Sequence, residues 1–214
     1  MRFKPTDACV LVVFALLWGT FSETALSQEI DKALKERMEK EKADRHGCKV
    51  LICGIARNKK AEGEDVACGV VQTWTMSELK EQILGGSFNW PWGNAQCKAD
   101  IRLERKVLAQ VLAGGTVEAK LAKHAVSCTL DQKDGADKYS ISFTIQPNVT
   151  FANGKATKVV LNWSDIEGSA LAKGAVWSAA TLDNNLGILE GAALRAINAF
   201  FGPKCDEVKD ELGN

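Results

Sequence analysis

Residues 139–163, YSISFTIQPNVTFANGKATKVVLNW, decide the fold, because apolar and polar side chains alternate along them with a period of two. The apolar members of the first run are Tyr139, Ile141, Phe143 and Ile145. Asn153-Gly154, between two such runs, is a strong hairpin signal. Residues 117–121 and 126–130 alternate in the same way. Together these segments predict an antiparallel β meander of four to five strands with one face buried.

Helical spacing of apolar residues flanks the predicted sheet on both sides. The segments with this spacing are residues 28–45, 66–84, 97–113, 169–180 and 183–200. Asp183 can cap the last helix, and Gly202-Pro203 ends it. The apolar segment 49–56 fits either a short buried helix or a strand. A helical N-terminal half, a meander and C-terminal helices predict an α+β fold.

The first 27 residues have the pattern of a cleaved signal peptide. Two basic residues precede an apolar run of 14 residues, from Ala8 to Phe21, and small residues stand at Ala25 and Ser27. We therefore predict cleavage after Ser27. A helix needs about 20 residues to span a bilayer, so an uncleaved N-terminal anchor is the weaker alternative. The remaining chain has no second apolar stretch of that length, and we expect a periplasmic or secreted protein without a membrane span.

Charge divides the remaining chain into an exposed segment and a domain. Residues 28–45 are dense in charge and carry a narrow apolar stripe at Ile30, Leu34 and Met38, which predicts an exposed helix. We expect residues 46–214 to form a single α+β domain. The formal net charge is zero, which offers no electrostatic case for nucleic acid as a partner.

Cysteine usage also indicates an oxidising compartment. Cleavage would remove Cys9 and leave an even number of cysteines, namely Cys48, Cys53, Cys68, Cys97, Cys128 and Cys205. Six cysteines allow 15 pairings, and we expect three disulfides that hold the domain together. Loop lengths favour the pairs Cys53–Cys68, Cys48–Cys97 and Cys128–Cys205. No Cys-x2-Cys pair is present, so we expect no metal and no cofactor.

One segment resembles a known family. Gly47-Cys48-Lys49-Val50-Leu51-Ile52-Cys53 is followed by a polar loop, Cys68 and Cys97, and residues 47–97 resemble the conjugal transfer protein TrbM family. The resemblance implies a small exported bacterial protein with a periplasmic role linked to conjugation and with no established catalysis. It also implies structural roles for these four cysteines. The predicted meander and the helices after it lie outside the resemblance.

The aromatic loop of residues 88–94, FNWPWGN, is the most unusual local feature. Trp90 and Trp92 flank Pro91, and tryptophans arranged in this way suit a partner-binding surface or a platform for sugars. The alternative is that both rings fold onto the core, since tryptophan is highly buried on average. The residue types alone favour the second interpretation.

The sequence contains no recognisable catalytic set. His46 and His124 lie outside any nucleophile motif, and no Gly-x-Ser-x-Gly is present. We therefore expect a non-catalytic binding or accessory protein, whose partner is another envelope protein or a cell-wall component. The alternative is an envelope enzyme that acts on cell-wall glycan through paired carboxylates. Its candidate residues are Glu78, Glu81, Asp165, Glu167 and Glu190.

Overall fold

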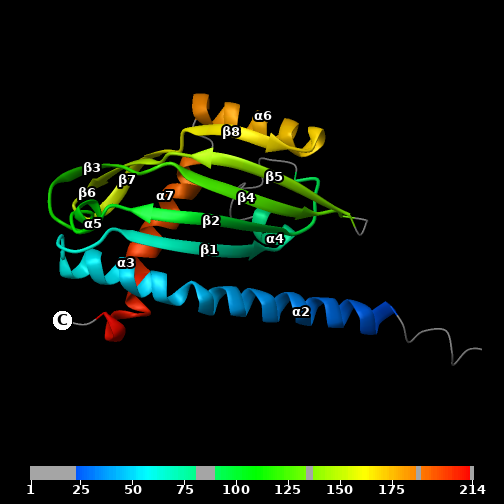
Figure 1. Cartoon of the computed structure of the whole chain (residues 1–214), viewed down its shortest axis with the longest axis horizontal. Coiled ribbons are helices and arrows are strands. Elements are labelled where there is room, and N and C mark those ends of the chain that lie inside the picture. The colour runs from blue at the N-terminus through cyan, green and yellow to red at the C-terminus, as the bar shows by residue number, and fades with distance from the viewer. Residues whose placement is uncertain (1–22, 81–89, 134–136, 187–188, 213–214) are drawn as a thin grey trace, which may run out of the picture. The chain divides into compact units, whose positions relative to one another are not determined.

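The computed structural model describes the chain except for residues 1–22, 81–89, 134–136, 187–188 and 213–214 (Figure 1). The chain divides into two compact units, residues 1–40 and 41–214, and each is described by itself. Most of the predicted signal segment lies outside the described residues.

Helix α2 (Glu23–Asp44) makes up the described part of the first unit and ends in the second. Between residues 31 and 40, all side chains are exposed except those of Leu34 and Met38. Lys32 and Glu36 form an i,i+4 ion pair of 3.8 Å on its surface. Over residues 31–40 this pattern matches the exposed, charged helix that the sequence predicts. Glu41, in the last part of the predicted segment, is buried instead.

The second unit contains two antiparallel sheets. The larger has the order β1-β2-β4-β5-β8, with β1 at Val66–Trp74, β2 at Ala95–Leu103, β4 at His124–Asp131, β5 at Lys138–Ile145 and β8 at Trp163–Gly168. The smaller has the order β3-β6-β7, with β3 at Thr116–Lys120, β6 at Asn148–Ala152 and β7 at Lys155–Val160. The predicted strands after residue 115 are thus shared between two sheets. Asn153 and Gly154 form the turn between β6 and β7 with φ of 51° and 79°, which confirms the predicted hairpin.

Helices complete the α+β fold that the sequence predicts. They are α3 (His46–Asn58), the short α4 (Met76–Glu78) and α5 (Arg105–Leu108), then α6 (Ala170–Leu186), α7 (Glu190–Ala199), η2 (Phe200–Lys204) and η3 (Lys209–Glu211). Asp183 lies within α6 rather than at a helix start. Its carboxylate nevertheless accepts a hydrogen bond of 2.6 Å from the backbone N–H of Leu189, directly before α7. The same carboxylate accepts one of 2.7 Å from the indole N–H of Trp163.

Two of the predicted helices are wrong, because residues 66–74 and 95–103 form strands β1 and β2. In β2, the inward-facing Cys97, Ala99, Ile101 and Leu103 alternate with exposed charged residues, which is a period of two. The expected helical stripe joined Ile101 of this strand to Leu108, which belongs to the short helix α5. Residues 81–84 of the other predicted helix lie outside the described residues.

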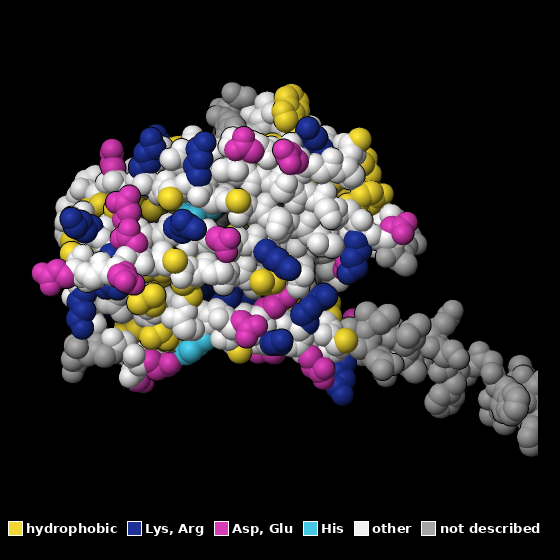
Figure 2. Space-filling view, in the orientation of Figure 1, with side chains coloured by type: hydrophobic (Ala, Val, Ile, Leu, Met, Phe, Trp, Pro, Cys, Tyr) yellow, Lys and Arg dark blue, Asp and Glu magenta, His cyan; other side chains and the backbone are white. Residues whose placement is uncertain are grey.

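The core of the second unit lies on one face of the larger sheet and around the smaller one. Beneath the larger sheet, Leu130 and Ile141 pack with Ala172 of α6. Around the smaller sheet, buried Phe151 and Val159 pack with side chains of α7. In Figure 1, α7 crosses behind the strands. The face turned to the viewer carries mainly polar and charged side chains, as Figure 2 shows, so one face of the sheet is solvated as predicted.

The exposed edge of β1 is capped by two side chains from the preceding helical region. The buried carboxylate of Glu41 accepts hydrogen bonds from the backbone N–H of Thr73 at 2.6 Å and from its hydroxyl at 2.8 Å. The guanidinium of Arg45 donates to the carbonyl oxygen of Val71. Helix residues four apart thus satisfy backbone groups that an edge strand would otherwise leave open to pairing with another chain.

Three disulfides join the elements, and each predicted pairing is wrong. The pairs are Cys48–Cys68, Cys53–Cys205 and Cys97–Cys128. The first joins α3 to β1, and the second joins α3 to the C-terminal segment across 152 residues. Cys97 and Cys128 lie directly opposite each other on β2 and β4. The spacing of the cysteines in the sequence does not predict this register, because residues far apart along the chain become neighbours only when the strands pair.

Replacing Glu41 should measurably weaken the second unit. Glu41→Ala leaves the buried groups of Thr73 and Gln96 without their acceptor, and we expect the free energy of unfolding to fall by about 2–3 kcal/mol. Urea unfolding followed by circular dichroism measures this change. Glu39→Ala, at an exposed position of the same helix, should change it by less than about 0.5 kcal/mol. Equal effects of the two substitutions would contradict the capping role.

Peptide mapping of unreduced protein should recover the three observed pairs. The Cys53→Ala/Cys205→Ala variant opens the longest loop, and we expect it to lose roughly 3–5 kcal/mol of unfolding free energy. The Cys48→Ala/Cys68→Ala variant opens a separation of 20 residues and should lose less, roughly 2–4 kcal/mol. Recovery of any other pair in the map would contradict the assignment.

Candidate functional site

A cavity of about 720 Å³ in the second unit is the candidate site. Helix α3 borders it on one side, and the inward-facing residues of β1 and β2 border it on another. Side chains of α5, β3, β6, α7 and η2 complete the wall. Pockets for small ligands in proteins are commonly about 300–1,000 Å³, so the volume suits one small molecule.

Most of the cavity wall is apolar. The apolar lining residues with at most half-exposed side chains are Cys48, Ile52, Val70, Ile101, Leu103, Val107, Leu108, Val111, Ala119, Leu121, Val149, Phe151, Ile197, Phe200 and Phe201. Phe151 and Phe200 each pack edge-on against Phe201, with ring centroids 5.9 and 5.4 Å apart. Such a wall would take up an apolar ligand by removing its surface from water.

The charged lining residues come from a few short segments. Lys42, Arg45 and Lys49 lie at the end of α2 and the start of α3, and Lys204 and Glu207 lie in the C-terminal segment. Together with Ile52, the three cations recur at the spacing of one helical face. Glu104 is the other acidic lining residue. The cavity is therefore amphipathic, with four fixed cations and two carboxylates among its lining residues.

The cations act together on the carboxylate of Glu207. The ammonium group of Lys49 donates a hydrogen bond of 3.0 Å to it, and this bond with the charge of Lys49 lowers the pKa of the Glu207 carboxyl. Burial opposes this shift, and the charges of Lys42 and Lys204 make smaller contributions that lower the pKa further. Three lysines of the cavity lining thus favour the ionised form of one carboxyl group.

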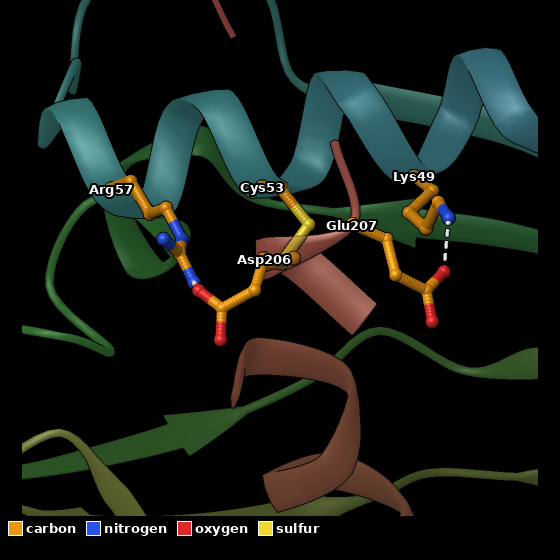
Figure 3. The surroundings of a disulfide bond; sticks show 6 residues. Lys49, Cys53, Arg57, Asp206 and Glu207 are labelled. Atoms are coloured by element: carbon orange, nitrogen blue, oxygen red, sulfur yellow. Dashed lines mark hydrogen bonds and ion pairs between the residues drawn. A yellow bond between two sulfur atoms is a disulfide. The ribbon is translucent and has the colours of Figure 1, made fainter. Parts of the chain in front are cut away.

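The C-terminal segment is attached to α3 beside this cluster, as Figure 3 shows. Cys53 is bonded to Cys205, and both are fully buried. On either side of this disulfide, Lys49 pairs with Glu207 at 3.0 Å and Arg57 pairs with Asp206 at 2.6 Å. One face of α3 therefore holds three consecutive residues of the C-terminal segment. This attachment fixes Lys204 and η2 in the cavity wall.

The structure places the predicted partner-binding residues, Trp90 and Trp92, against the core. Trp92 is 2% exposed, and its ring lies edge-on to that of Trp90 with centroids 5.0 Å apart. The indole N–H of Trp90 donates to the carbonyl oxygen of Gly93 at 2.8 Å. Both rings join the cluster beneath the larger sheet, so neither lines the cavity. The six predicted disulfide cysteines are all paired, and only Cys48 lines the cavity.

Of the predicted carboxylates that the structure describes, Asp165 and Glu167 lie two residues apart on β8 and line a second hollow of about 590 Å³, beside Asp100. Glu78 and Glu190 do not line that hollow. Glu78 caps the first turn of α4 with Thr75, and Glu190 begins α7. Asp165 and Glu167 are exposed on β8, whereas Glu81 lies outside the described residues. None of these residues lines the cavity.

Neither histidine forms part of a recognisable catalytic arrangement. His46 lines the cavity and pairs with Glu211 at 2.8 Å. His124 is 3% exposed on β4, with its Nδ1 atom 3.4 Å from the carbonyl oxygen of Asp100. Burial lowers the pKa of the His124 imidazole, and the Asp100 carbonyl partly opposes this effect.

The described residues offer neither a metal site nor a membrane-spanning helix. Across these ranges, no three or more His, Cys, Asp or Glu side chains are grouped so that they could hold a metal ion. Among the helices that the structure describes, none is both long and apolar enough to cross a membrane. The cavity is thus the feature of the described chain that best suits a ligand.

Comparison of the chain with protein-family models, with curated proteins and with solved structures finds no match. The resemblance of residues 47–97 to the TrbM family therefore stays a prediction.

Acid should destabilise the protein through His124. Because the folded state holds the pKa of His124 below its ordinary value of 6.5, the unfolded chain binds a proton first as the pH falls. The free energy of unfolding should therefore decrease from about pH 7 toward the lowered pKa. Urea unfolding at pH 7.5 and 5.5 measures the decrease, and His124→Gln should reduce it. His46→Gln should retain the His124 contribution, and the same pH dependence in wild type and His124→Gln would contradict the assignment.

Proposed function

We propose that the protein is a non-catalytic binding protein that takes an apolar small molecule into the cavity of its second unit. The observation that carries the proposal is the cavity itself, about 720 Å³ in volume and walled mainly by aliphatic and phenylalanine side chains. A folded protein usually fills its interior at high packing density, so a space of this size suggests a use. The half-buried rings of Phe200 and Phe201 would supply aromatic contact area.

A binding role fits the chemistry of the wall better than a catalytic one. The cavity lining holds one histidine and two glutamates, of which His46 and Glu207 are already paired with charged side chains. The carboxylates expected to serve a glycan-acting enzyme lie elsewhere, and the tryptophans expected to line its cleft pack in the core. Asp165 and Glu167 do line a second hollow on the larger sheet, but neither Trp90 nor Trp92 lines it with them.

We place this activity outside the cytoplasm. Three disulfides among six cysteines support an oxidising compartment, and the signal pattern of residues 1–27 would supply the export. A periplasmic accessory role linked to conjugation or secretion is the corresponding proposal from the TrbM resemblance. In such a role the protein would carry or sense an apolar molecule within the envelope, beside an envelope protein or cell-wall component as its partner.

A neutral fluorescent probe tests the cavity directly. N-phenyl-1-naphthylamine, whose emission rises in apolar surroundings, should bind the purified protein saturably at one site. Ala196→Trp places a large ring on the cavity wall from the exposed face of α7, and we expect it to weaken probe binding at least tenfold. Ala170→Trp, at an exposed helical position away from the cavity, is the matched control and should leave binding within about twofold.

Thermal unfolding of both variants is the control for folding, and we expect both to unfold cooperatively as the wild type does. Absence of saturable probe binding to wild type would overturn the proposal. Equal binding by Ala196→Trp and Ala170→Trp would overturn it as well, because the probe would then occupy another surface.

A further inference from the structure

We propose that the ligand of this cavity is a single-chain fatty acid, held with its carboxylate among the lysines and its chain against the apolar wall. The inference rests on the proposed function and adds the chemical class of the ligand. It is carried by the separation of charge from apolar surface within one cavity.

The cations gather on one part of the cavity wall. Lys42 and Lys49 come from the helical region around residue 45, and Lys204 comes from the C-terminal segment that the Cys53–Cys205 disulfide attaches to α3. Lys49 donates a hydrogen bond of 3.0 Å to the carboxylate of Glu207, and the charges of Lys42 and Lys204 also lower the pKa of that carboxyl. Two segments far apart in sequence thus contribute to one cationic cluster.

Some cations of this cluster form no ion pair with the acidic residues beside them. Lys49 is paired with Glu207, and the guanidinium of Arg45 is bound to the carbonyl oxygen of Val71. Within the described part of the chain, the ammonium groups of Lys42 and Lys204 make no ion pair. The acidic groups beside the cluster are committed elsewhere, since Asp206 pairs with Arg57 and Glu211 pairs with His46. An incoming monoanion would therefore meet two available ammonium groups.

The remaining wall matches a hydrocarbon chain. Val111, Val149 and Phe151 are buried, and Phe200 and Phe201 are half-buried beside them. A straight chain can bend to follow such a wall, whereas an anion without a chain would leave the apolar surface uncovered. Each buried methylene should strengthen binding roughly fourfold until the wall is filled. Glu104 is the second acidic lining residue, and its negative charge would repel the carboxylate of the ligand. The ligand's carboxylate would therefore bind near the lysines.

Three twelve-carbon compounds test the head group by displacement of the neutral probe. Laurate, dodecanol and dodecylamine share a chain and differ in the charge of the head at pH 7.5. We expect laurate to displace the probe at a concentration at least tenfold lower than dodecanol, and dodecylamine to be the weakest. Higher salt should weaken laurate more than dodecanol, because the lysines are exposed to solvent.

A charge-removing variant tests which residues hold the head. Lys42→Gln/Lys204→Gln should weaken laurate at least tenfold and leave dodecanol within about twofold. Lys98→Gln/Lys155→Gln removes two exposed lysines that do not line the cavity, and it should leave both ligands unchanged.

The outcomes separate this inference from the proposed function. Equal displacement by laurate and dodecanol, or no effect of Lys42→Gln/Lys204→Gln on laurate, would overturn the fatty-acid assignment while the apolar cavity stands. If the probe binds but neither laurate nor dodecanol displaces it, the assignment also fails. If the probe itself does not bind, the proposed function fails first.

Discussion

The disulfide between Cys53 and Cys205 is the constraint on which the cavity depends. It joins α3 to a segment 152 residues away, and both sulfur-bearing side chains are fully buried. Beside it, buried Val208 packs with Val50 and Leu212, and the partly exposed ion pairs of Lys49 and Arg57 each contribute little by comparison. The crosslink restricts the unfolded chain and so stabilises the arrangement that makes η2 part of the cavity wall.

Helix α3 depends in turn on the edge of the larger sheet. Arg45 lies directly before α3, and its hydrogen bond to Val71 sets that end of the helix against β1. Cys48 fixes the next turn to the same strand through Cys68. The helix therefore covers an edge strand whose free backbone N–H and C=O groups could otherwise pair with another chain. The same attachment turns Lys42 and Lys49 toward the cavity, so that protection of the sheet and assembly of the cationic cluster share one cause.

The sequence predicted those elements whose pattern is local. Alternation over residues 139–145 and the Asn153-Gly154 turn are decided within a few residues, and both were confirmed. Strand β1 was missed because Val70, Val71 and Trp74 also fit one face of a helix, and a short apolar segment does not distinguish the two periods. The disulfide pairs were missed because they depend on tertiary register. Cys97 meets Cys128 only when β2 pairs with β4.

The candidate site was hidden from the sequence for a related reason. Lys42, Arg45 and Lys49 form a readable helical stripe, yet Lys204 joins them only through the fold. The charges of Lys42 and Lys204 lower the pKa of the Glu207 carboxyl, yet neither ammonium group forms an ion pair within the described part of the chain. An anionic ligand would pair with both of them, and its chain would cover the apolar wall beside them. A single amphiphilic occupant thus accounts for both features, and for their presence in the same cavity.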